Sequence, residues 1–392
     1  MNSTKDEKDH RPLRAVFVVN SDRAFWTHRS TWATYLITSG YEVHVLAPDT
    51  GHRRRIEGIG AIFHDLNLGR EDVGALVGVT AASRIAYWLL RIRPQLVFLV
   101  QTAAYTLGWP AAIALRKTKF VRVAGGVGRA LGLSAASQSR SARLVRGSLR
   151  LAARLPNVWT LFQLEGDREL FAREALATPS RSWVVPGTGI DTNLWSPKAD
   201  DAAPATLTVG FVSRLYAEKG VYEFVDAARR LRDRGLRFAI VGAPDVGVRS
   251  SVSADEIEQW EHEGIIEWWG QRDDMVATFR ALDLLVFPSR HPEGTPRTLI
   301  EAAACGVPAI VSDQEGCRAV VADGRSGWVL KSTSADEVAV AIAAVTSDRI
   351  ELAAAGAAAR SRAQASFSLG STLSAVFSGC GINTAHTTGN QE

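Results

Sequence analysis

Two carboxylates eight positions apart, Glu293 and Glu301, are the residues of this chain best placed to do chemistry. Gly294, Thr295 and Pro296 follow the first of them, and a proline suits the first turn of a helix. We therefore expect Glu293 just before a helix N-terminus and Glu301 about one and a half turns inside that helix. Such an N-terminus presents free N–H groups to a phosphate, so the segment indicates a sugar-nucleotide site. The spacing alone also fits an ordinary loop-to-helix junction with solvated acids.

Two cations, Arg214 and Lys219, also lie next to a predicted strand end, earlier in the chain than the two carboxylates. A β-rich run at 207–212 precedes Arg214 and Lys219, which flank the turn at its C-terminal end. A diphosphate needs two or more cations or N–H donors, and arginine can bind it bidentately. The alternative is a pair of solvated cations beside a turn.

The elements that must position these residues alternate between β-rich and helical stretches, which predicts parallel sheets with helices on both faces. We expect strands at 15–19, 42–47, 62–66, 96–100, 120–123, 159–162 and 183–185, and then at 207–212, 238–241, 265–268, 284–287, 309–311 and 328–330. A polar, proline-flanked linker at 197–204 separates the two series. The sequence thus predicts two doubly wound domains, residues 1–196 and 205–377, and a disordered tail at 378–392. Two such domains would face each other across a cleft and bind ligands at the C-terminal ends of their strands.

The spacing of Glu293 and Glu301 resembles the Glu-x7-Glu motif of retaining glycosyltransferases with the GT-B fold, specifically glycosyltransferase family four. Residues 214–220 match the family's Arg-Leu-x-x-x-Lys-Gly element closely. Further family elements follow in the family's order at 241–243, 267–271, 282–289, 301–308 and 324–328. The resemblance covers roughly residues 14–370 and implies a fold of two Rossmann-like α/β domains.

The resemblance also implies roles for the residues that match. Arg214 and Lys219 would bind the donor diphosphate, and Glu301 would hold the ribose hydroxyls. Glu293 would meet the donor sugar and the positive charge that develops at its anomeric carbon. The backbone around Gly294, Thr295, Pro296 and Arg297 would complete the phosphate cradle, and Gly242, Gly270 and Gln271 would line the nucleotide site.

The sequence predicts a metal-independent reaction without a cofactor beyond the donor. Other sugar transferases often hold a metal with an Asp-x-Asp pair, and this chain has none. Arg214, Lys219 and the helix N-terminus would instead neutralise the leaving diphosphate. We expect transfer with retention at the anomeric carbon, in which the departing phosphate takes the proton of the attacking hydroxyl.

The first half resembles family members that act on undecaprenyl-diphosphate-linked sugars for O-antigens, capsules or protein glycosylation. The matching residues include Ser21 and Asp22 after the first strand, Gly125 and Gly126 after a later one, and Gln163. His28 is expected between the first strand and the first helix, where it would bind the acceptor or a donor phosphate or serve as a structural histidine. Two departures stand out on this acceptor side: many relatives have a histidine where this chain has glycine after Ala124, and the subgroup usually has asparagine where it has Leu164.

Charge and composition add an independent signal. The net charge is +4, but residues 73–164 contain thirteen Lys and Arg and no acidic residue, which favours an anionic partner. Arginines at 140, 143, 146, 150 and 154 fall on one arc of a helix, with Leu144, Val145, Leu149, Leu151 and Leu155 on the remaining face. Such a helix can rest on an anionic membrane, or it can be a solvated face whose leucines pack on the sheet. No nucleic-acid motif accompanies it, so we expect no nucleic-acid partner.

The remaining composition fits a cytoplasmic protein. Three cysteines without paired spacing fit a reducing compartment, and the polar start of the chain does not read as a signal peptide. The uncharged stretch 95–115 reads as a buried strand followed by a helix, not as a membrane span.

The sequence therefore predicts a GT-B glycosyltransferase at the inner face of the plasma membrane. It would move a hexose or N-acetylhexosamine, UDP-linked by preference, from a nucleotide sugar to a polyprenyl-diphosphate-linked saccharide. The alternatives are a sugar-nucleotide epimerase or hydrolase of the same architecture, and a non-catalytic membrane-bound scaffold. A scaffold would not need Arg214, Lys219, Glu293 and Glu301 together.

Overall fold

The computed structural model describes residues 12–67, 75–125, 140–198, 206–245, 248 and 250–382. The predicted site residue Gly126, most of the expected linker at 197–204 and the tail from 383 lie outside these ranges. The chain divides into two compact units, residues 1–185 with 373–392 (unit 1) and residues 186–372 (unit 2).

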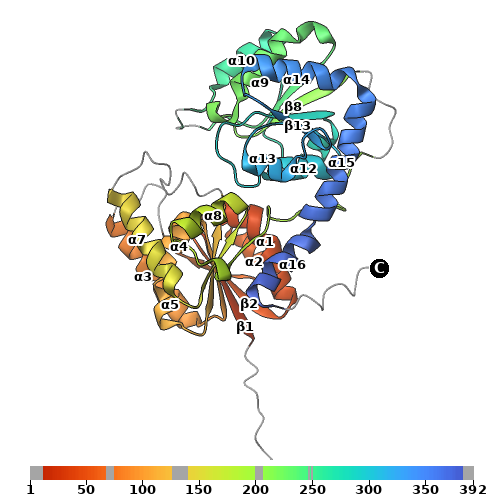
Figure 1. The fold of residues 1–392 in the computed structure, drawn as a ribbon. Coiled ribbons are helices and arrows are strands. Elements are labelled where there is room, and N and C mark those ends of the chain that lie inside the picture. Colours follow the sequence, from red (N-terminus) through yellow and green to blue (C-terminus); the bar gives the residue numbers. More distant parts are fainter. Residues whose placement is uncertain are drawn as a thin grey trace, which may run out of the picture. The chain divides into compact units, whose positions relative to one another are not determined.

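Unit 1 is a seven-stranded, wholly parallel sheet in the order β3-β2-β1-β4-β5-β6-β7. Its strands are β1 (Leu13–Val18), β2 (Tyr41–Ala47), β3 (Ile62–Asp65), β4 (Leu96–Val100), β5 (Lys119–Ala124), β6 (Val158–Phe162) and β7 (Ser182–Val184). Its helices are α1 (Asp22–Thr38), α2 (Arg53–Gly58), α3 (Ala75–Ile92), α4 (Gln101–Gly108), α5 (Ala111–Ala114), α7 (Arg140–Arg154), α8 (Glu165–Arg173), η1 (Pro179–Arg181) and the larger part of α16 (Leu369–Cys380). In Figure 1, α3, α4, α5 and α7 lie on one side of the sheet and α1, α2 and α16 on the other.

Unit 2 is a six-stranded parallel sheet in the order β10-β9-β8-β11-β12-β13. Its strands are β8 (Thr208–Val212), β9 (Arg237–Val241), β10 (Glu267–Gly270), β11 (Leu284–Phe287), β12 (Ala309–Ser312) and β13 (Gly327–Leu330). Its helices are η2 (Ala217–Lys219), α9 (Val221–Arg230), η3 (Arg232–Arg234), α10 (Ala254–His262), α11 (Met275–Arg280), α12 (Arg297–Ala304), α13 (Glu315–Val320), α14 (Ala335–Ser347) and α15 (Arg349–Phe367). One apolar cluster packs α9, α10 and α14 on one face of the sheet, and a second packs α11, α12, α13 and α15 on the other.

The structure confirms the expected fold class. All thirteen expected strands are present within two residues of their predicted ends, because most of them are short apolar runs that the sheet buries. The uncharged stretch 95–115 is strand β4 followed by α4 and α5, as expected. Among the described residues, no helix combines the length and the apolar character that crossing a bilayer requires.

The boundaries of the units differ from those expected, because both ends of unit 2 are fixed by tertiary contacts. The backbone N–H of Ile190 donates to Phe367 O at 2.9 Å, and Arg360 Nη2 donates to Thr192 O at 2.7 Å, so residues 186–196 belong with unit 2. The expected tail also starts too early, since α16 continues to Cys380. There it packs on unit 1, where Phe377 stacks on Tyr35 with ring centroids 4.7 Å apart.

Candidate active site

The carboxyl ends of the unit 2 strands gather most of the predicted donor-site residues. Arg214 and Lys219 follow β8, Gly242 follows β9, and the loop that carries Glu293 follows β11. Because all these strands are parallel, their carboxyl ends meet at one edge of the sheet, where open α/β sheets bind ligands. The structure thus gathers segments that are up to about eighty residues apart in the sequence.

Glu293 is held by two groups from two strand ends. The Lys219 ammonium contacts its Oε1, and the Ser289 hydroxyl donates to the same oxygen at 3.1 Å. Ser312 Oγ in turn donates to Ser289 O at 2.6 Å, which fixes the serine. Neither bond to the carboxylate uses Oε2, so that oxygen can accept a bond from a sugar hydroxyl while Oε1 anchors the side chain.

A glycine brings Lys219 to this position. Gly220 has φ of +85°, and a Cβ there would lie 2.5 Å from Pro288 O. Only glycine permits both the left-handed backbone and this close approach of the β8 and β11 loops. Lys219 is consequently buried, with 7% of its surface exposed, and Glu293 partners it.

Glu301 lies in the second turn of α12 and is also buried. Arg297 Nε donates to its Oε1 at 2.7 Å across one helical turn. Burial raises the pKa of the Glu301 carboxyl, and the charge and hydrogen bond of Arg297 oppose that shift in part. Pro296 is the N-cap of α12, one residue before the expected first turn, because its extended ψ of 120° is not helical.

Gly316 is a site residue that sequence reasoning missed. It lies at the start of α13, where a Cβ would stand 1.6 Å from Gly294 O and 2.7 Å from Glu293 O. The backbone of the Glu293 loop therefore rests directly on this glycine. A glycine just after a strand end was the available signal, but nothing in the sequence links it to a loop twenty residues earlier.

Gly242 and Gly270 lie side by side at the ends of β9 and β10. Gly242 N donates to Gly270 O at 2.9 Å, and a Cβ on Gly242 would lie 2.0 Å from Ser213 O. The indole of Trp268 donates to Gly242 O at 2.9 Å. Backbone atoms and not side chains therefore line this part of the strand edge, so a ligand could approach the backbone closely here.

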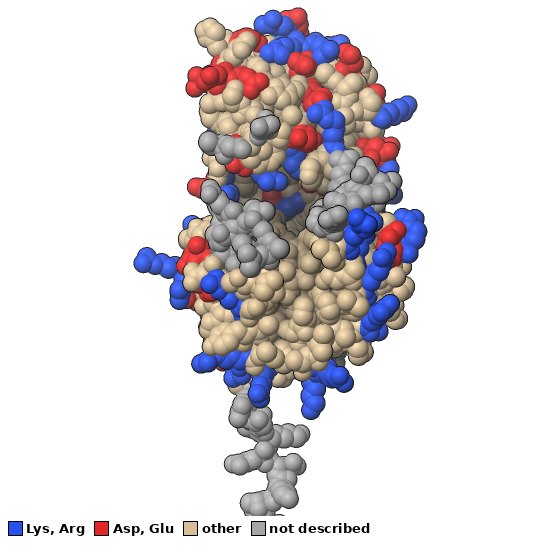
Figure 2. Space-filling view, turned by 90° about the vertical axis from the view of Figure 1, so that its left-hand side faces the viewer, with Lys and Arg blue, Asp and Glu red and all other residues tan. Residues whose placement is uncertain are grey.

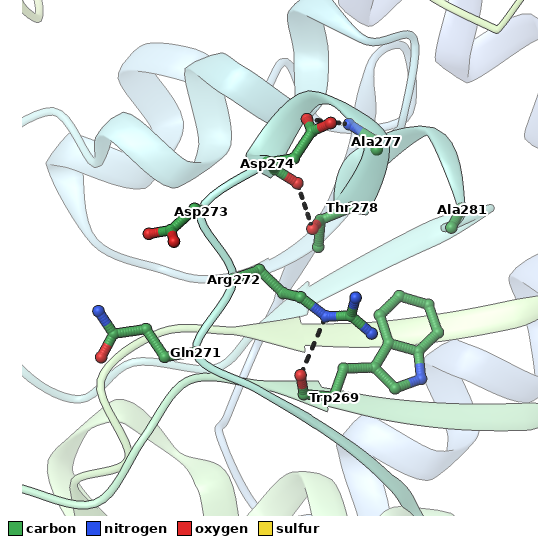
Figure 3. A pocket seen from close by; sticks show the side chains of 8 residues that line it. All are labelled: Trp269, Gln271, Arg272, Asp273, Asp274, Ala277, Thr278 and Ala281. Carbon is green, nitrogen blue, oxygen red and sulfur yellow. Dashed lines mark hydrogen bonds between the residues drawn. The ribbon is translucent and has the colours of Figure 1, made fainter.

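Gln271 lies instead in a separate open pocket of about 510 Å³ beside α11, shown in Figure 3. Arg272 Nε donates to Trp269 O at 3.0 Å there, and Asp274 caps α11 by accepting from Ala277 N at 2.9 Å. The Gln271 side chain points away from the Trp269 ring. The pocket's lining residues are Trp269, Gln271, Arg272, Asp273, Asp274, Ala277, Thr278 and Ala281, so it does not include the two glutamates.

Arg214 is an exposed cation at this edge. Its guanidinium lies over the Tyr216 ring, 4.9 Å from the centroid, and the Tyr216 hydroxyl donates to Asp245. Stacking orients the guanidinium while leaving its side chain accessible to an anion. The buried Lys219 and the exposed Arg214 are therefore two cations of different exposure at the same edge.

In unit 1, Asp22 has a structural role that the sequence did not reveal. It is fully buried and accepts from the backbone N–H groups of Thr50 at 2.7 Å and His52 at 3.0 Å, as well as from the Thr50 hydroxyl. Burial by itself would raise the pKa of Asp22, but these hydrogen bonds and that from Arg23 N outweigh it and lower the pKa. Ser21 caps α1, accepting from Ala24 N at 3.3 Å.

The expected position of His28 is wrong. Ser21 starts α1 so early that His28 lies nearly two turns inside the helix instead of before it.

The structure brings two other predicted residues of the acceptor side together. Gly125 and Gln163 lie at the ends of the paired strands β5 and β6, where a Cβ on Gly125 would lie 2.9 Å from Gln163 Oε1.

Helix α7 differs from its predicted packing. Leu149 is fully buried, and Val145 and Leu155 pack against the core. These three residues agree with the interpretation of α7 as a helix whose apolar residues pack on the sheet. Leu144 and Leu151, however, are 75% and 52% exposed. The reading in which all of these leucines pack on the sheet is wrong for Leu144 and Leu151, because on a helix these two residues point about 150° away from Leu149 and so cannot reach the sheet with it.

No group of three or more histidine, cysteine or acidic side chains is arranged to hold a metal ion within the described ranges. The described residues therefore do not themselves outline a metal centre.

Comparisons with known proteins agree with this architecture. Residues 16–153 match the family "Glycosyl transferase 4-like", and residues 198–362 match "Glycosyl transferases group 1". Among curated proteins, N,N'-diacetylbacillosaminyl-diphospho-undecaprenol alpha-1,3-N-acetylgalactosaminyltransferase of Campylobacter jejuni is 30% identical over 39% of this chain and 38% of its own. The Escherichia coli UDP-Gal:alpha-D-GlcNAc-diphosphoundecaprenol alpha-1,3-galactosyltransferase is 25% identical over 47% of this chain and 50% of its own. The chain thus spans half or less of the length of these relatives.

Among solved structures, HepE of Anabaena in complex with UDP and glucose is similar over 94% of this chain and 99% of its own. The TM-score is 0.73 at 19% identity, which shows a shared fold. The two family matches together cover well over half of the sequence, in the order of the two sheets. The chain therefore belongs to the GT-B glycosyltransferases, with a 4-like N-terminal domain and a group 1 C-terminal domain.

Proposed function

We propose that this protein is a retaining glycosyltransferase that needs no metal. It moves a hexose or N-acetylhexosamine from a nucleotide sugar, UDP-linked by preference, to a polyprenyl-diphosphate-linked saccharide. The observation that carries the proposal is the anchoring of Glu293 by Lys219 and Ser289 at the carboxyl edge of the unit 2 sheet. It joins a carboxylate, a buried cation and a glycine-lined backbone at a place where such sheets bind nucleotides.

The donor fits the charges at this edge. Arg214 and Lys219 supply two positive charges for a diphosphate, and the backbone N–H groups that open α12 supply donors. Glu301 would accept bonds from the two ribose hydroxyls. The hydrogen bond from Arg297 holds the Glu301 carboxylate in one orientation. A carboxylate needs a fixed orientation to accept hydrogen bonds from both hydroxyls of a diol.

The reaction follows from the same groups. The bond between the anomeric carbon and the diphosphate oxygen breaks, and the acceptor hydroxyl forms its new bond to that carbon from the leaving-group face. The hydroxyl proton passes to the departing phosphate oxygen, so proton and charge balance without a separate base. Glu293 would stabilise the positive charge on the sugar, and Lys219 and Arg214 the negative charge on the diphosphate.

The acceptor class is supported by the relatives. The names of both the Campylobacter and the E. coli relatives specify sugars linked to diphospho-undecaprenol, and the latter names a UDP sugar. The juxtaposition of Gly125 and Gln163 offers a polar, glycine-lined place for acceptor groups in unit 1. A polyprenyl acceptor would place the enzyme at the cytoplasmic face of the membrane.

The donor part is tested by calorimetric titration of the protein with UDP, GDP and ADP. We expect selective binding of UDP, weakened roughly tenfold to a hundredfold in Lys219→Ala, since a charged hydrogen bond contributes about 1.5–3 kcal/mol. Lys331→Ala, which removes an exposed lysine of the same unit, is the control. Wild-type affinity in Lys219→Ala would remove the diphosphate role of that lysine.

The reaction is tested with a UDP sugar and a synthetic polyprenyl-diphosphate-linked saccharide. Transfer to the acceptor with an α-linked product supports the proposal. Sugar release or epimerisation without an acceptor would indicate the hydrolase or epimerase alternative, and no nucleotide binding at all would indicate a scaffold.

A further inference from the structure

The outer surface of α3, α5 and α7 in unit 1 has a composition that the active site does not explain. These helices cover the same side of the sheet, where α5 packs on α3 and α4 packs on both α3 and α7. Their inward residues belong to one apolar cluster, which includes Ile85, Leu89, Ala112, Leu149 and Ala152. We call the outward-facing residues of these three helices the α3–α5–α7 surface.

Helix α7 contributes both apolar and basic groups to this surface. Leu144 and Leu151 are the exposed leucines described above, and Arg143, Arg150 and Arg154 are exposed beside them. At 100° per residue the five side chains fall within an arc of about 120°. One of the arginines, Arg150, also contacts Glu174 at 3.4 Å. Leucines and arginines therefore share the solvent-facing side of α7.

Helices α3 and α5 extend the apolar part. Val79, Tyr87 and Leu90 are 46% to 66% exposed and follow one line along the outside of α3, and Ile113 of α5 is 53% exposed. Half of the twelve exposed large apolar side chains in the described ranges lie on these three helices. Scattered single apolar residues are normal on a protein surface, but a gathering of this kind marks an interaction site.

The charge of this surface is of one sign. No residue from 73 to 164 is acidic, and Arg91, Arg93, Arg116 and Lys117 are exposed at the ends of α3 and α5. Figure 2 shows this side of unit 1, in the lower half of the view, as a broad tan area edged by blue side chains with few red ones. An apolar area edged by cations matches the headgroup boundary of an anionic bilayer, which offers apolar chains below a layer of phosphates.

We propose that the α3–α5–α7 surface is a membrane-docking surface, whose apolar side chains enter an anionic bilayer while the cations bind its lipid phosphates. The occupant is a lipid leaflet, which a lipid-linked acceptor requires, and in this respect the inference rests on the proposed function. It goes beyond a single basic helix, because the surface spans three helices and its apolar residues insert. Charge attraction brings the protein to the leaflet, and insertion makes the binding partly resistant to salt.

The test is sedimentation of the full chain with vesicles of phosphatidylcholine alone and of an equal mixture with phosphatidylglycerol. The wild type should bind the mixed vesicles and retain part of that binding in high salt. The apolar variant Tyr87→Gln/Leu144→Gln/Leu151→Gln should bind at least tenfold more weakly and lose the salt-resistant part. The charge variant Arg143→Glu/Arg154→Glu should also bind at least tenfold more weakly, since each basic residue contributes about fivefold near an anionic surface.

Matched controls lie in unit 2. Leu194→Gln/Val340→Gln/Ile350→Gln replaces three side chains of similar or greater exposure, and Arg234→Glu/Lys331→Glu makes the same charge change with exposed cations. Both controls should bind vesicles like the wild type. The UDP affinity and thermal midpoint of every variant show that its fold is intact.

Three outcomes of the vesicle assay would overturn the inference: no binding of the wild type to mixed vesicles, equal losses in the α3–α5–α7 surface variants and the unit 2 controls, or a loss in the charge variant alone. Retention of duplex DNA instead of vesicles would assign the surface to a nucleic acid and likewise overturn it. UDP binding tests the proposed function separately from vesicle binding. A protein that binds vesicles through this surface but binds no UDP keeps the docking surface and loses the transferase assignment.

Discussion

The substitution Gly316→Ala tests whether the Glu293 loop is positioned by backbone contact. A Cβ at this position would lie 1.6 Å from Gly294 O, and real Cβ atoms keep at least 3.0 Å from other heavy atoms. The carbonyl must therefore retreat by about 1.4 Å, and neither partner is a flexible side chain that could yield instead. Glu293 is the neighbouring residue and would move with the loop.

The expected effect is mainly on turnover. A displacement of about 1 Å in a group that acts on the transition state can reduce the rate roughly a hundredfold. We therefore expect kcat to fall about a hundredfold while the affinity for UDP stays within about threefold, since Glu301 belongs to the buried part of α12 and keeps its place. Overpacking of this kind also costs about 1–3 kcal/mol of stability, which lowers the thermal midpoint.

The assay measures sugar transfer to the lipid-linked acceptor, with UDP titration and thermal unfolding on the same samples. Gly58→Ala in α2 is the control, because no atom lies within 4 Å of the Cβ it would add. Wild-type turnover in Gly316→Ala would refute the reasoning, as would an equal loss of turnover in the control. Loss of UDP binding along with turnover would show that the contact supports the whole donor site and not Glu293 in particular.

Three further predictions follow from the same structure. Ser289→Ala should lower kcat about fivefold with UDP affinity unchanged, because one hydrogen bond of about 1 kcal/mol orients Glu293. Glu301→Gln should abolish tight UDP binding yet raise the thermal midpoint at pH 7. Burial raises the pKa of the Glu301 carboxyl, so its ionisation at pH 7 costs the folded protein stability. That stability is regained below pH 4.5, the pKa of the unfolded chain, where the thermal midpoints of the wild type and the variant should converge. Asp22→Asn should cost about 2–3 kcal/mol at pH 7, because donors such as Thr50 N lose the charged acceptor that the buried Asp22 provides. Since these hydrogen bonds lower the pKa of Asp22, its contribution is present above pH 3.8 and fades as pH falls through the lower folded value, and urea midpoints at neutral and acid pH measure this.

Much of the fold was predictable because parallel strands are short apolar runs with turn residues between them. Strands β4 and β11 have the predicted ends, and the others differ by one or two residues. The end of unit 1 was not predictable in the same way. Residues 378–380 are small and carry no large apolar side chain, so they resemble a tail. Phe377 just before them stacks on Tyr35, and helix α16 continues to Cys380. A local pattern does not contain that distant partner.

The candidate site divides in a similar manner. The motif residues Glu293 and Glu301 were recognisable from their spacing, and the start of α12 between them follows from Pro296. Asp22 was recognised as a site residue, but its bonds to the loop at 50–52 arise only when β1 and β2 pair. The sequence left open whether the leucines of α7 pack on the sheet or face outward, because periodicity gives the faces of a helix and not which arc the sheet covers.

The sequence by itself determined the class of the fold, the order of its strands along the chain and the residues proposed to bind a nucleotide sugar, because these depend on local patterns and on motifs within short segments. Only the tertiary structure decided that Lys219 and Ser289 share one oxygen of Glu293 and that Gly316 supports the Glu293 loop. It also decided that α3, α5 and α7 expose one apolar and basic surface. The physical reason is the same in each case: these contacts join residues far apart in sequence, and sheet pairing and helix packing alone bring them within reach of each other.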